Sequence, residues 1–187
     1  MFITKLELNM SNWDNMRGFS DFGYFHSQLE RCFAEDREHP LWRLDNNTIL
    51  FLSEIPPQVS ESFGYAQTKS YDPKIPAGTV LNYRITANPV IKRDGRRVPL
   101  NMKRTKNQQY CALDWLIDRL KAGGASALSV NIIENEIRKA KNGKVRYQAT
   151  TFEGKLVVED AELFRNILMN GLGHEKAYGC GLLLVRP

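Results

Sequence analysis

A dense cluster of glycines constrains the fold more than any other stretch of this sequence. Gly171, Gly173, Gly179 and Gly181 lie within the segment GLGHEKAYGCGLLL. Glycine accepts positive φ angles and lets the main chain approach another group closely. An apolar pattern at helical spacing over 161–169 precedes this loop, and a buried strand over 181–185 follows it. P-loops and dinucleotide-binding loops run strand, loop, helix, so the order helix, loop, strand excludes both.

The glycine loop has two interpretations that the residues leave open. Its backbone N–H groups could form a concave anion site, with Lys176 as a point charge suited to phosphate. Alternatively, the loop is a tight connection that needs glycine only for packing.

The first part of the chain predicts the element order βαββαβ. Residues 11–18 are polar and are expected to be irregular. The pattern predicts, in order, a strand over 1–9, a helix from Ser20 or Asp21 to Ala34, short strands over 41–44 and 49–52, a short helix opening at Pro56, and a strand near 67–71.

The same element order then restarts after Tyr71–Gly78, a segment rich in proline and glycine that predicts a linker. The expected elements are a strand over 79–89, a loop over 92–106, a helix over 108–121, strands over 128–137 and 145–158 joined by a turn at Asn142-Gly143, a helix over 161–170 and the strand over 181–185. The predicted fold class is therefore α+β, with two tandem ferredoxin-like domains, 1–74 and 79–187. No repeat is visible between the halves, so this prediction depends on element order alone.

Positive charge is concentrated in two segments. The chain has a net charge of +5, yet Lys92–Lys106 alone carries +6 and Arg138–Arg146 carries +5, so the remainder is acidic. A mildly acidic body with two basic segments is typical of a polyanion-binding protein and favours nucleic acid. The alternatives are solvated loops or, for the second segment, lysines that protect an edge strand.

Several other classes of protein are not supported. The three cysteines, Cys32, Cys111 and Cys180, are far apart and fit neither a disulfide framework nor a metal-binding spacing. No signal peptide is visible at Met1–Asn9, and no apolar run approaches the length of a membrane span. A reducing cytoplasm is the expected compartment.

His26 is one of three histidines and lies on the first predicted helix. At about 100° per residue, Phe22, Phe25 and Leu29 belong to the buried stripe of this helix, and His26 falls roughly 70° from its centre. A histidine between the buried and exposed faces of a helix usually has no functional role. The position also allows an imidazole to be held by packing and still reach a substrate.

Together these residues resemble the CasE-type CRISPR repeat endoribonucleases, the crRNA-processing members of the RAMP group, nearly from end to end. The likeness is carried by YRITANP at 83–89 with a basic loop and RVPL at 97–100, by Trp115-Leu116, by KNGK at 141–144, by FEG at 152–154, and by the glycine loop with Lys176. The Ala-Asn-Pro segment and the glycine loop are specific in combination.

The resemblance implies a metal-independent cut in CRISPR precursor RNA at the base of each repeat hairpin. The 2′-hydroxyl attacks the adjacent phosphate and leaves a 2′,3′-cyclic phosphate and a 5′-hydroxyl, with no cofactor. The product RNA stays bound, and the protein joins the other subunits of a Cascade complex, with no role for a membrane. His26 matches the family's catalytic histidine.

The expected RNA contacts follow from the same resemblance and from the basic segments. They are Lys92, Arg93, Arg96, Arg97, Lys103, Arg104, Arg138, Lys139, Lys141, Lys144, Arg146, Gly171, Gly173, His174, Lys176 and Gly179.

The sequence departs from the family pattern near the catalytic position. Members often place a tyrosine three residues before the histidine, where this chain has Gly23, so Tyr24 is the expected catalytic substitute. Arg31 occupies a position that is basic in some members and is the third candidate catalytic residue. On an ideal helix these side chains point roughly 160° and 140° away from His26. His174 is unexpected within the loop.

Two other functions remain open at this stage. One is a RAMP-type RNA-binding subunit that does not cut. The other is a ferredoxin-like enzyme acting on a small phosphorylated metabolite, which would leave the two basic segments without a role.

Overall fold

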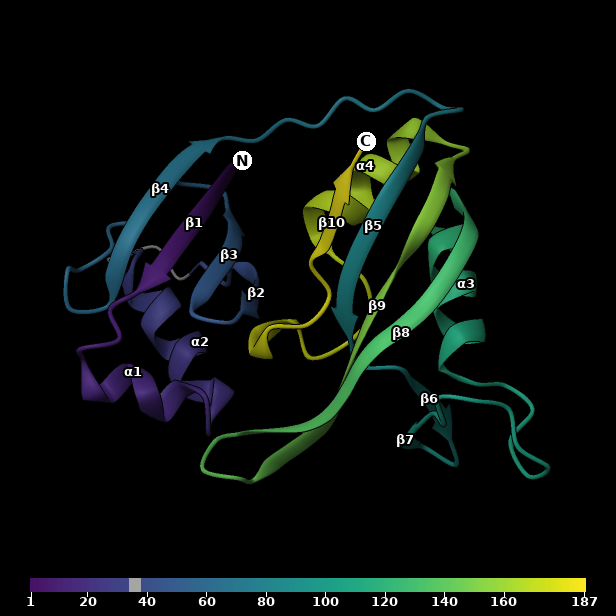
Figure 1. Cartoon of the computed structure of the whole chain (residues 1–187), viewed down its shortest axis with the longest axis horizontal. Helices are drawn as coiled ribbons and strands as arrows, with labels where there is room; N and C mark the ends of the chain where they lie inside the picture. The colour runs from purple at the N-terminus through teal and green to yellow at the C-terminus, as the bar shows by residue number, and fades with distance from the viewer. Residues whose placement is uncertain (34–37) are drawn as a thin grey trace.

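The computed structural model describes residues 1–33 and 38–187, and its strands form two four-stranded antiparallel sheets (Figure 1). The first sheet has the spatial order β2 (Leu41–Asp45), β3 (Thr48–Ser53), β1 (Phe2–Leu8), β4 (Gly64–Ser70). The second has the order β10 (Leu183–Arg186), β5 (Val80–Ala87), β9 (Val145–Val158), β8 (Ala125–Ala140).

Both sheets arrange their strands in the same way. In each, the strand that comes first in the sequence lies between the third and the fourth, and the second strand is at the far edge. This is the strand order of the ferredoxin-like fold. The predicted fold class, α+β with two tandem ferredoxin-like units, is confirmed.

Helices cover each sheet and enclose a core. In the first half, α1 (Trp13–Gly18) leads into α2 (Phe22–Arg31), whose buried residues share a core with Leu6, Trp42 and Phe51. In the second half, α3 (Ala112–Ala122) and α4 (Ala161–Asn170) bury apolar side chains against the sheet. Asp21 caps α2 by accepting a hydrogen bond from the Gly23 amide at 2.9 Å, as its predicted start requires. The predicted end of α2 at Ala34 lies outside the described residues.

The short helix expected from Pro56 does not form. Residues 61–63 make a turn closed by the Phe63 amide on the Ser60 carbonyl, and β4 already begins at Gly64. The segment is short, and its two prolines donate no helical hydrogen bonds. Conversely, residues 13–18 were expected to be irregular but form α1, because the Asn12 side chain caps it.

The basic segment 92–106 was predicted to be a loop, and this is wrong for its first half. β6 (Val90–Arg93) and β7 (Arg96–Pro99) form a hairpin whose turn residues, Asp94 and Gly95, have positive φ angles of 48° and 76°. Asp-Gly is a strong hairpin signal. The predicted turn at Asn142-Gly143 is present, and β8 extends further at both ends than expected.

Residues 71–78 contain neither helix nor strand and cross from one sheet to the other, as expected of a linker (Figure 1). Two further segments cross between the halves. The far end of the β8–β9 hairpin and the 3₁₀ turn η1 (Lys176–Tyr178) both contact α2. Ala140, Tyr147 and Tyr178, which belong to the second half of the sequence, are therefore buried in the first core.

The three cysteines are free and buried. Within the described residues, no helix is both long and apolar enough to span a bilayer.

Candidate active site

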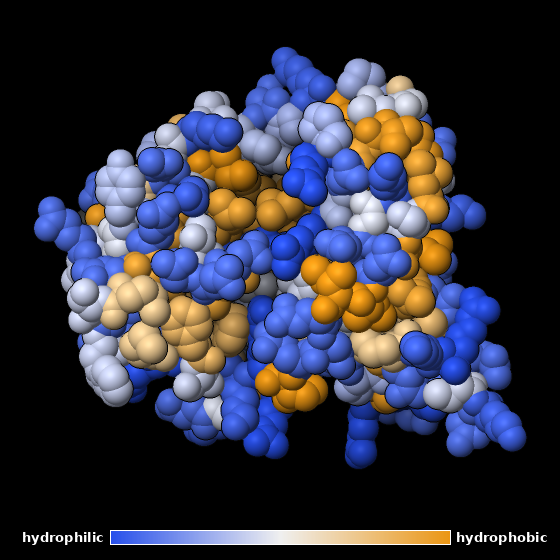
Figure 2. Space-filling view, viewed as in Figure 1, coloured by the Kyte–Doolittle hydropathy of each residue, from blue (hydrophilic) through white to orange (hydrophobic). Residues whose placement is uncertain are grey.

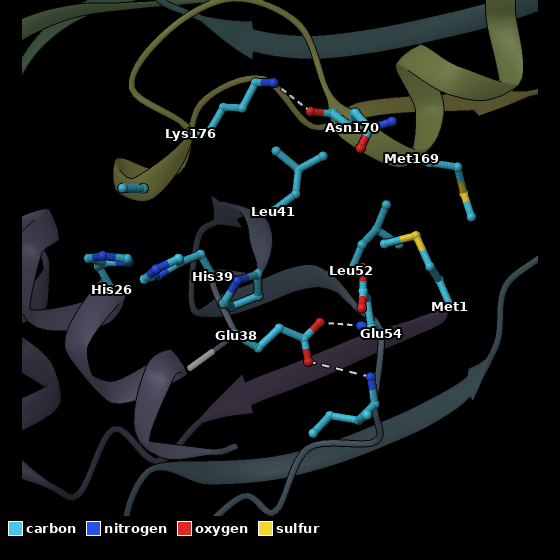
Figure 3. Close-up of a pocket in the computed structure, with 13 residues that line it drawn as sticks. Met1, His26, Glu38, His39, Leu41, Leu52, Glu54, Met169, Asn170 and Lys176 are labelled. Atoms are coloured by element: carbon cyan, nitrogen blue, oxygen red, sulfur yellow. Dashed lines mark hydrogen bonds between the residues drawn. The ribbon is translucent and has the colours of Figure 1, made fainter. Parts of the chain in front are cut away.

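A cleft of about 870 Å³ opens between the first sheet and the glycine loop (Figure 3). In the space-filling view, apolar side chains gather between the two halves of the molecule, with hydrophilic ones around them (Figure 2). The cleft combines such apolar walls with six polar side chains: His26, Glu38, His39, Glu54, Asn170 and Lys176. His26 and Lys176, which are distant in the sequence, thus face the same space.

His26 lies at the edge of the buried face of α2, as the helical geometry predicted. Its side chain is 19% exposed, and the Tyr178 ring packs edge-on against it with 5.9 Å between ring centroids. Its Nδ1 atom is buried and has no hydrogen-bond partner among the described residues. The imidazole is therefore fixed by packing on one side and open to the cleft on the other.

Burial lowers the pKa of His26 below the ordinary value of 6.5, because the charged imidazolium loses solvation. Glu30 acts in the opposite direction, while His39 and Lys141 lower the pKa further by charge repulsion. The net effect leaves His26 mainly neutral near pH 7, the state in which an imidazole can accept a proton.

Glu30 joins His26 to a second histidine that the sequence analysis did not single out. The Oε1 atom of Glu30 lies 3.4 Å from His26 Nε2 and 2.6 Å from His39 Nδ1. His26 and Glu30 are four residues apart on α2 and share one helix face. That spacing was visible in the sequence, but the approach of His39 depends on the chain path after α2.

Lys176 projects from η1 at the rim of the cleft. Its Nζ donates a hydrogen bond of 2.6 Å to the Asn170 carbonyl at the end of α4, and burial lowers its pKa. η1 itself is anchored from both halves of the chain. Trp42 Nε1, from the first half, donates to the Ala177 carbonyl at 3.1 Å, and the Tyr147 hydroxyl, from the second half, donates to the Tyr178 carbonyl at 2.7 Å. These bonds hold the glycine loop beside His26.

The glycines of this loop serve packing. Gly179, at φ +78°, leaves little room for a side chain, because a Cβ would lie 3.1 Å from the Trp42 ring. A Cβ on Gly173 would lie 2.9 Å from Trp115. The amides of Gly171, Gly179 and Gly181 bond to backbone carbonyls within the protein. The structure thus supplies a packing reason for the cluster and leaves few of its amides for an anion.

Tyr24 and Arg31 do not line the His26 cleft. They face a separate groove of about 600 Å³ that also includes Lys141 and Asn142 from the β8–β9 hairpin tip. The Tyr24 hydroxyl points to Asn15 Oδ1 at 3.5 Å, and burial raises its pKa. The directions expected from an ideal helix therefore hold, and α2 separates these side chains from the cleft.

Half of the predicted RNA-contact residues are exposed on two hairpins. The exposed members on the β6–β7 and β8–β9 hairpins are Lys92, Arg93, Arg96, Arg97, Lys139, Lys141, Lys144 and Arg146. Lys103 is exposed in the loop that follows β7. The hairpin tip of β8–β9 docks on α2, where the Asn142 amide donates to Asp21 Oδ2 at 2.5 Å.

Three predicted contacts differ from this pattern. Arg138 is 8% exposed and stacks over the Phe22 ring at 4.4 Å, with its Nε 2.5 Å from Glu136. It was expected at an exposed hairpin end, but the hairpin bends onto α2 and buries it. Arg104 is held by Asp114 at 2.6 Å. His174 opens onto another pocket beside Trp115, where burial lowers its pKa.

The fold and the cleft together define a class of protein. Its members have two tandem ferredoxin-like units, a half-buried histidine that faces a cleft bounded by a loop, and basic hairpins on the second unit. The family model described as "CRISPR associated protein" matches residues 1–187, so the chain belongs to this family. The resemblance expected from the sequence is confirmed.

Named relatives agree with this assignment. The chain is 32% identical over 217 aligned residues to the "CRISPR-associated endoribonuclease Cse3" of Thermus thermophilus, covering all of both chains. It is 29% identical over 133 residues to the "CRISPR system Cascade subunit CasE" of Escherichia coli, covering 65% of each. Among solved structures, Thermus thermophilus Cse3 "bound to an RNA representing a pre-cleavage complex" superimposes with a TM-score of 0.87 at 28% identity, covering 100% of this chain and 98% of that one.

Proposed function

We propose that this protein is a metal-independent endoribonuclease that cuts CRISPR precursor RNA at the base of the repeat hairpin, in the cytoplasm. The observation that carries the proposal is the half-buried His26 imidazole facing the cleft beside η1, where burial lowers its pKa. The full-length relative named as an endoribonuclease and its RNA-bound structure support the substrate class.

The proposed reaction uses a nucleophile that the RNA itself supplies. His26 accepts the proton of the 2′-hydroxyl while O2′ forms a bond to the adjacent phosphorus. The bond from phosphorus to O5′ breaks, and the leaving oxygen takes up a proton, which gives a 2′,3′-cyclic phosphate and a 5′-hydroxyl. The protein then needs only to align the groups, move a proton and stabilise charge.

Lys176 is the proposed partner of His26 for the scissile phosphate. Its ammonium lines the same cleft and is held by a single backbone carbonyl, that of Asn170. Rotation of its flexible side chain would bring the charge to a phosphate oxygen. Tyr24 and Arg31 face the other side of α2, so we assign them to contact with the RNA backbone and not to proton transfer.

The RNA stem is proposed to lie against the two basic hairpins. Phosphate contacts from exposed Lys and Arg fix the position of a helix without reading its sequence. Arg104 and Arg138 are given structural roles, because Asp114 and Glu136 already hold their guanidinium groups. After cleavage the product stays bound, and the protein joins a Cascade complex, as the name of the CasE relative suggests.

The decisive experiment compares wild type with His26→Ala and His26→Gln on a repeat hairpin, with chelator present. We expect both variants to lose roughly 10²–10⁴ in single-turnover rate, the usual contribution of a general base, while hairpin affinity stays within about twofold. Gln preserves much of the side-chain volume but cannot take the proton. A 2′-deoxy substitution at the cut site should permit binding and prevent cutting.

Three results would contradict the proposal. Equal rates for wild type and the His26 variants would place the chemistry elsewhere. Cleavage of the 2′-deoxy substrate would exclude the internal nucleophile. Tight binding by wild type without any cutting would favour the alternative, a non-cleaving RNA-binding subunit.

A further inference from the structure

His26, Glu30 and His39 form a cluster of metal-type ligands at one end of the cleft. One ligand atom from each residue lies within 4.8 Å of the ligand atoms of the other two. Among the described residues, these three form the group of possible metal ligands that meets this distance. Two imidazoles and one carboxylate are the donor set of many open zinc sites.

The distances in the cluster are close to those a bound ion requires. Ligands about 2.0–2.1 Å from a tetrahedral zinc ion stand roughly 3.3 Å from one another. His26 Nε2 and Glu30 Oε1 already lie 3.4 Å apart. His39 Nδ1, at 2.6 Å from the same oxygen, must withdraw by less than about 1 Å to reach this spacing.

The cluster is also accessible and adjustable. Side-chain exposure rises from 19% at His26 and 35% at Glu30 to 70% at His39, so the last ligand can move and an ion can enter from solvent. The nearby Glu38 carboxylate accepts hydrogen bonds from the Glu54 and Ile55 amides (Figure 3). The fourth coordination position would face the open cleft, because His26 and His39 both line it.

We propose that His26, Glu30 and His39 bind a divalent transition-metal ion, such as Zn²⁺, and that the bound ion switches cleavage off. Imidazole ligands favour zinc, nickel, cobalt and copper over magnesium and calcium, which prefer oxygen donors. The inhibitory part depends on the proposed function. The lone pair of His26 Nε2 cannot bind the ion and accept the 2′-hydroxyl proton at the same time.

Zinc binding is tested first, without reference to activity. The full, untagged chain is stripped with chelator and dialysed against Zn²⁺, and bound zinc is measured by elemental analysis, with Co²⁺ absorption as a second readout. We expect one ion per chain, at least about tenfold weaker binding in His39→Ala and in Glu30→Gln, and unchanged stoichiometry in His174→Ala. No bound zinc, or equal affinity in His39→Ala, would overturn the site.

Inhibition is then measured as the ratio of cleavage rates with and without Zn²⁺ for each variant. Wild type should lose about 10²–10⁴, the same factor as His26→Ala, whereas the ratio for His39→Ala should stay near one and Mg²⁺ should not inhibit. Acceleration by zinc, or equal inhibition of His39→Ala, would overturn the switch. A chain that binds one zinc through His39 but never cuts RNA would overturn the proposed function and leave the site standing.

Discussion

His26 combines two properties: its ring is fixed by packing against Tyr178, and its side chain lines the cleft. Its charge state is set by a small number of neighbours. Burial, His39 and Lys141 favour the neutral imidazole, and Glu30 favours the charged one. Each neighbour can be removed separately, so the balance can be measured.

The lowered pKa of His26 predicts the acid limb of the cleavage reaction. Because His26 must be neutral to accept a proton, the single-turnover rate with chelator present should rise as the pH increases. The midpoint of this rise should lie below pH 6.5. Removing the repulsion with Lys141→Ala should move the midpoint up, whereas removing the attraction with Glu30→Gln should move it down. The pH dependence of the cleavage rate, measured with saturating protein, gives the midpoint for each variant. Midpoints that move in the same direction in both variants would contradict this account.

Gly179 and Gly143 offer a matched test of the packing argument. Both have φ near +78°, so alanine pays a similar backbone penalty of about 1–2 kcal/mol at either site. Only at Gly179 does the new Cβ meet the fully buried Trp42 ring, which adds about 1–3 kcal/mol of overpacking. Urea unfolding should therefore show the larger loss for Gly179→Ala. Equal losses would mean that the loop simply moves away.

Individual residues were predictable where local geometry decides their position. The angle on an ideal helix placed His26 at the border and turned Tyr24 and Arg31 away from it, as found. Arg138 was not predictable, because its burial depends on where a long hairpin bends. His39 was missed because its contact with Glu30 is tertiary, and no local pattern in the sequence predicts it.

At the scale of elements, the β6–β7 hairpin carries four exposed basic residues, Lys92, Arg93, Arg96 and Arg97. If Lys92, Arg93 and Arg96 each contact a phosphate of the RNA stem, replacing all three with Gln should reduce the slope of log affinity against log salt by about 3. Arg104→Gln is the control, because Asp114 already holds that guanidinium, and its slope should change by less than about 1. The slopes are measured from RNA hairpin binding between low and moderate salt. An equal change of slope per replaced residue in the two variants would show that the ion pair with Asp114 does not keep Arg104 from contacting phosphate.

Helices and strands were predicted correctly where the sequence contains clear turn or capping residues. The predictions failed where a turn signal was missed or where tertiary packing favoured another local structure. Asn142-Gly143 marked one hairpin correctly, and Asp94-Gly95 would have marked the other. The helix expected from Pro56 did not form, because a turn after Ser60 is enough to bury Phe63 against the first core.

At the scale of the whole molecule, the proposed division into 1–74 and 79–187 follows the two sheets but not the cores. Tyr147, Tyr178 and Cys180 are buried with residues of the first half. We therefore expect a single calorimetric unfolding transition, with equal calorimetric and van't Hoff enthalpies. Doubling the linker 71–78 with Gly and Ser should change stability by only about 0.6 kcal/mol. Two separate transitions would mean that the shared core contributes little.

The anchoring of η1 by Trp42 and Tyr147 has a consequence for protein synthesis. His26 and the strands of the first sheet leave the ribosome early, whereas the wall beside them arrives only with residues 176–180. A nascent chain therefore carries the His26 imidazole before the cleft wall that η1 forms has been synthesised.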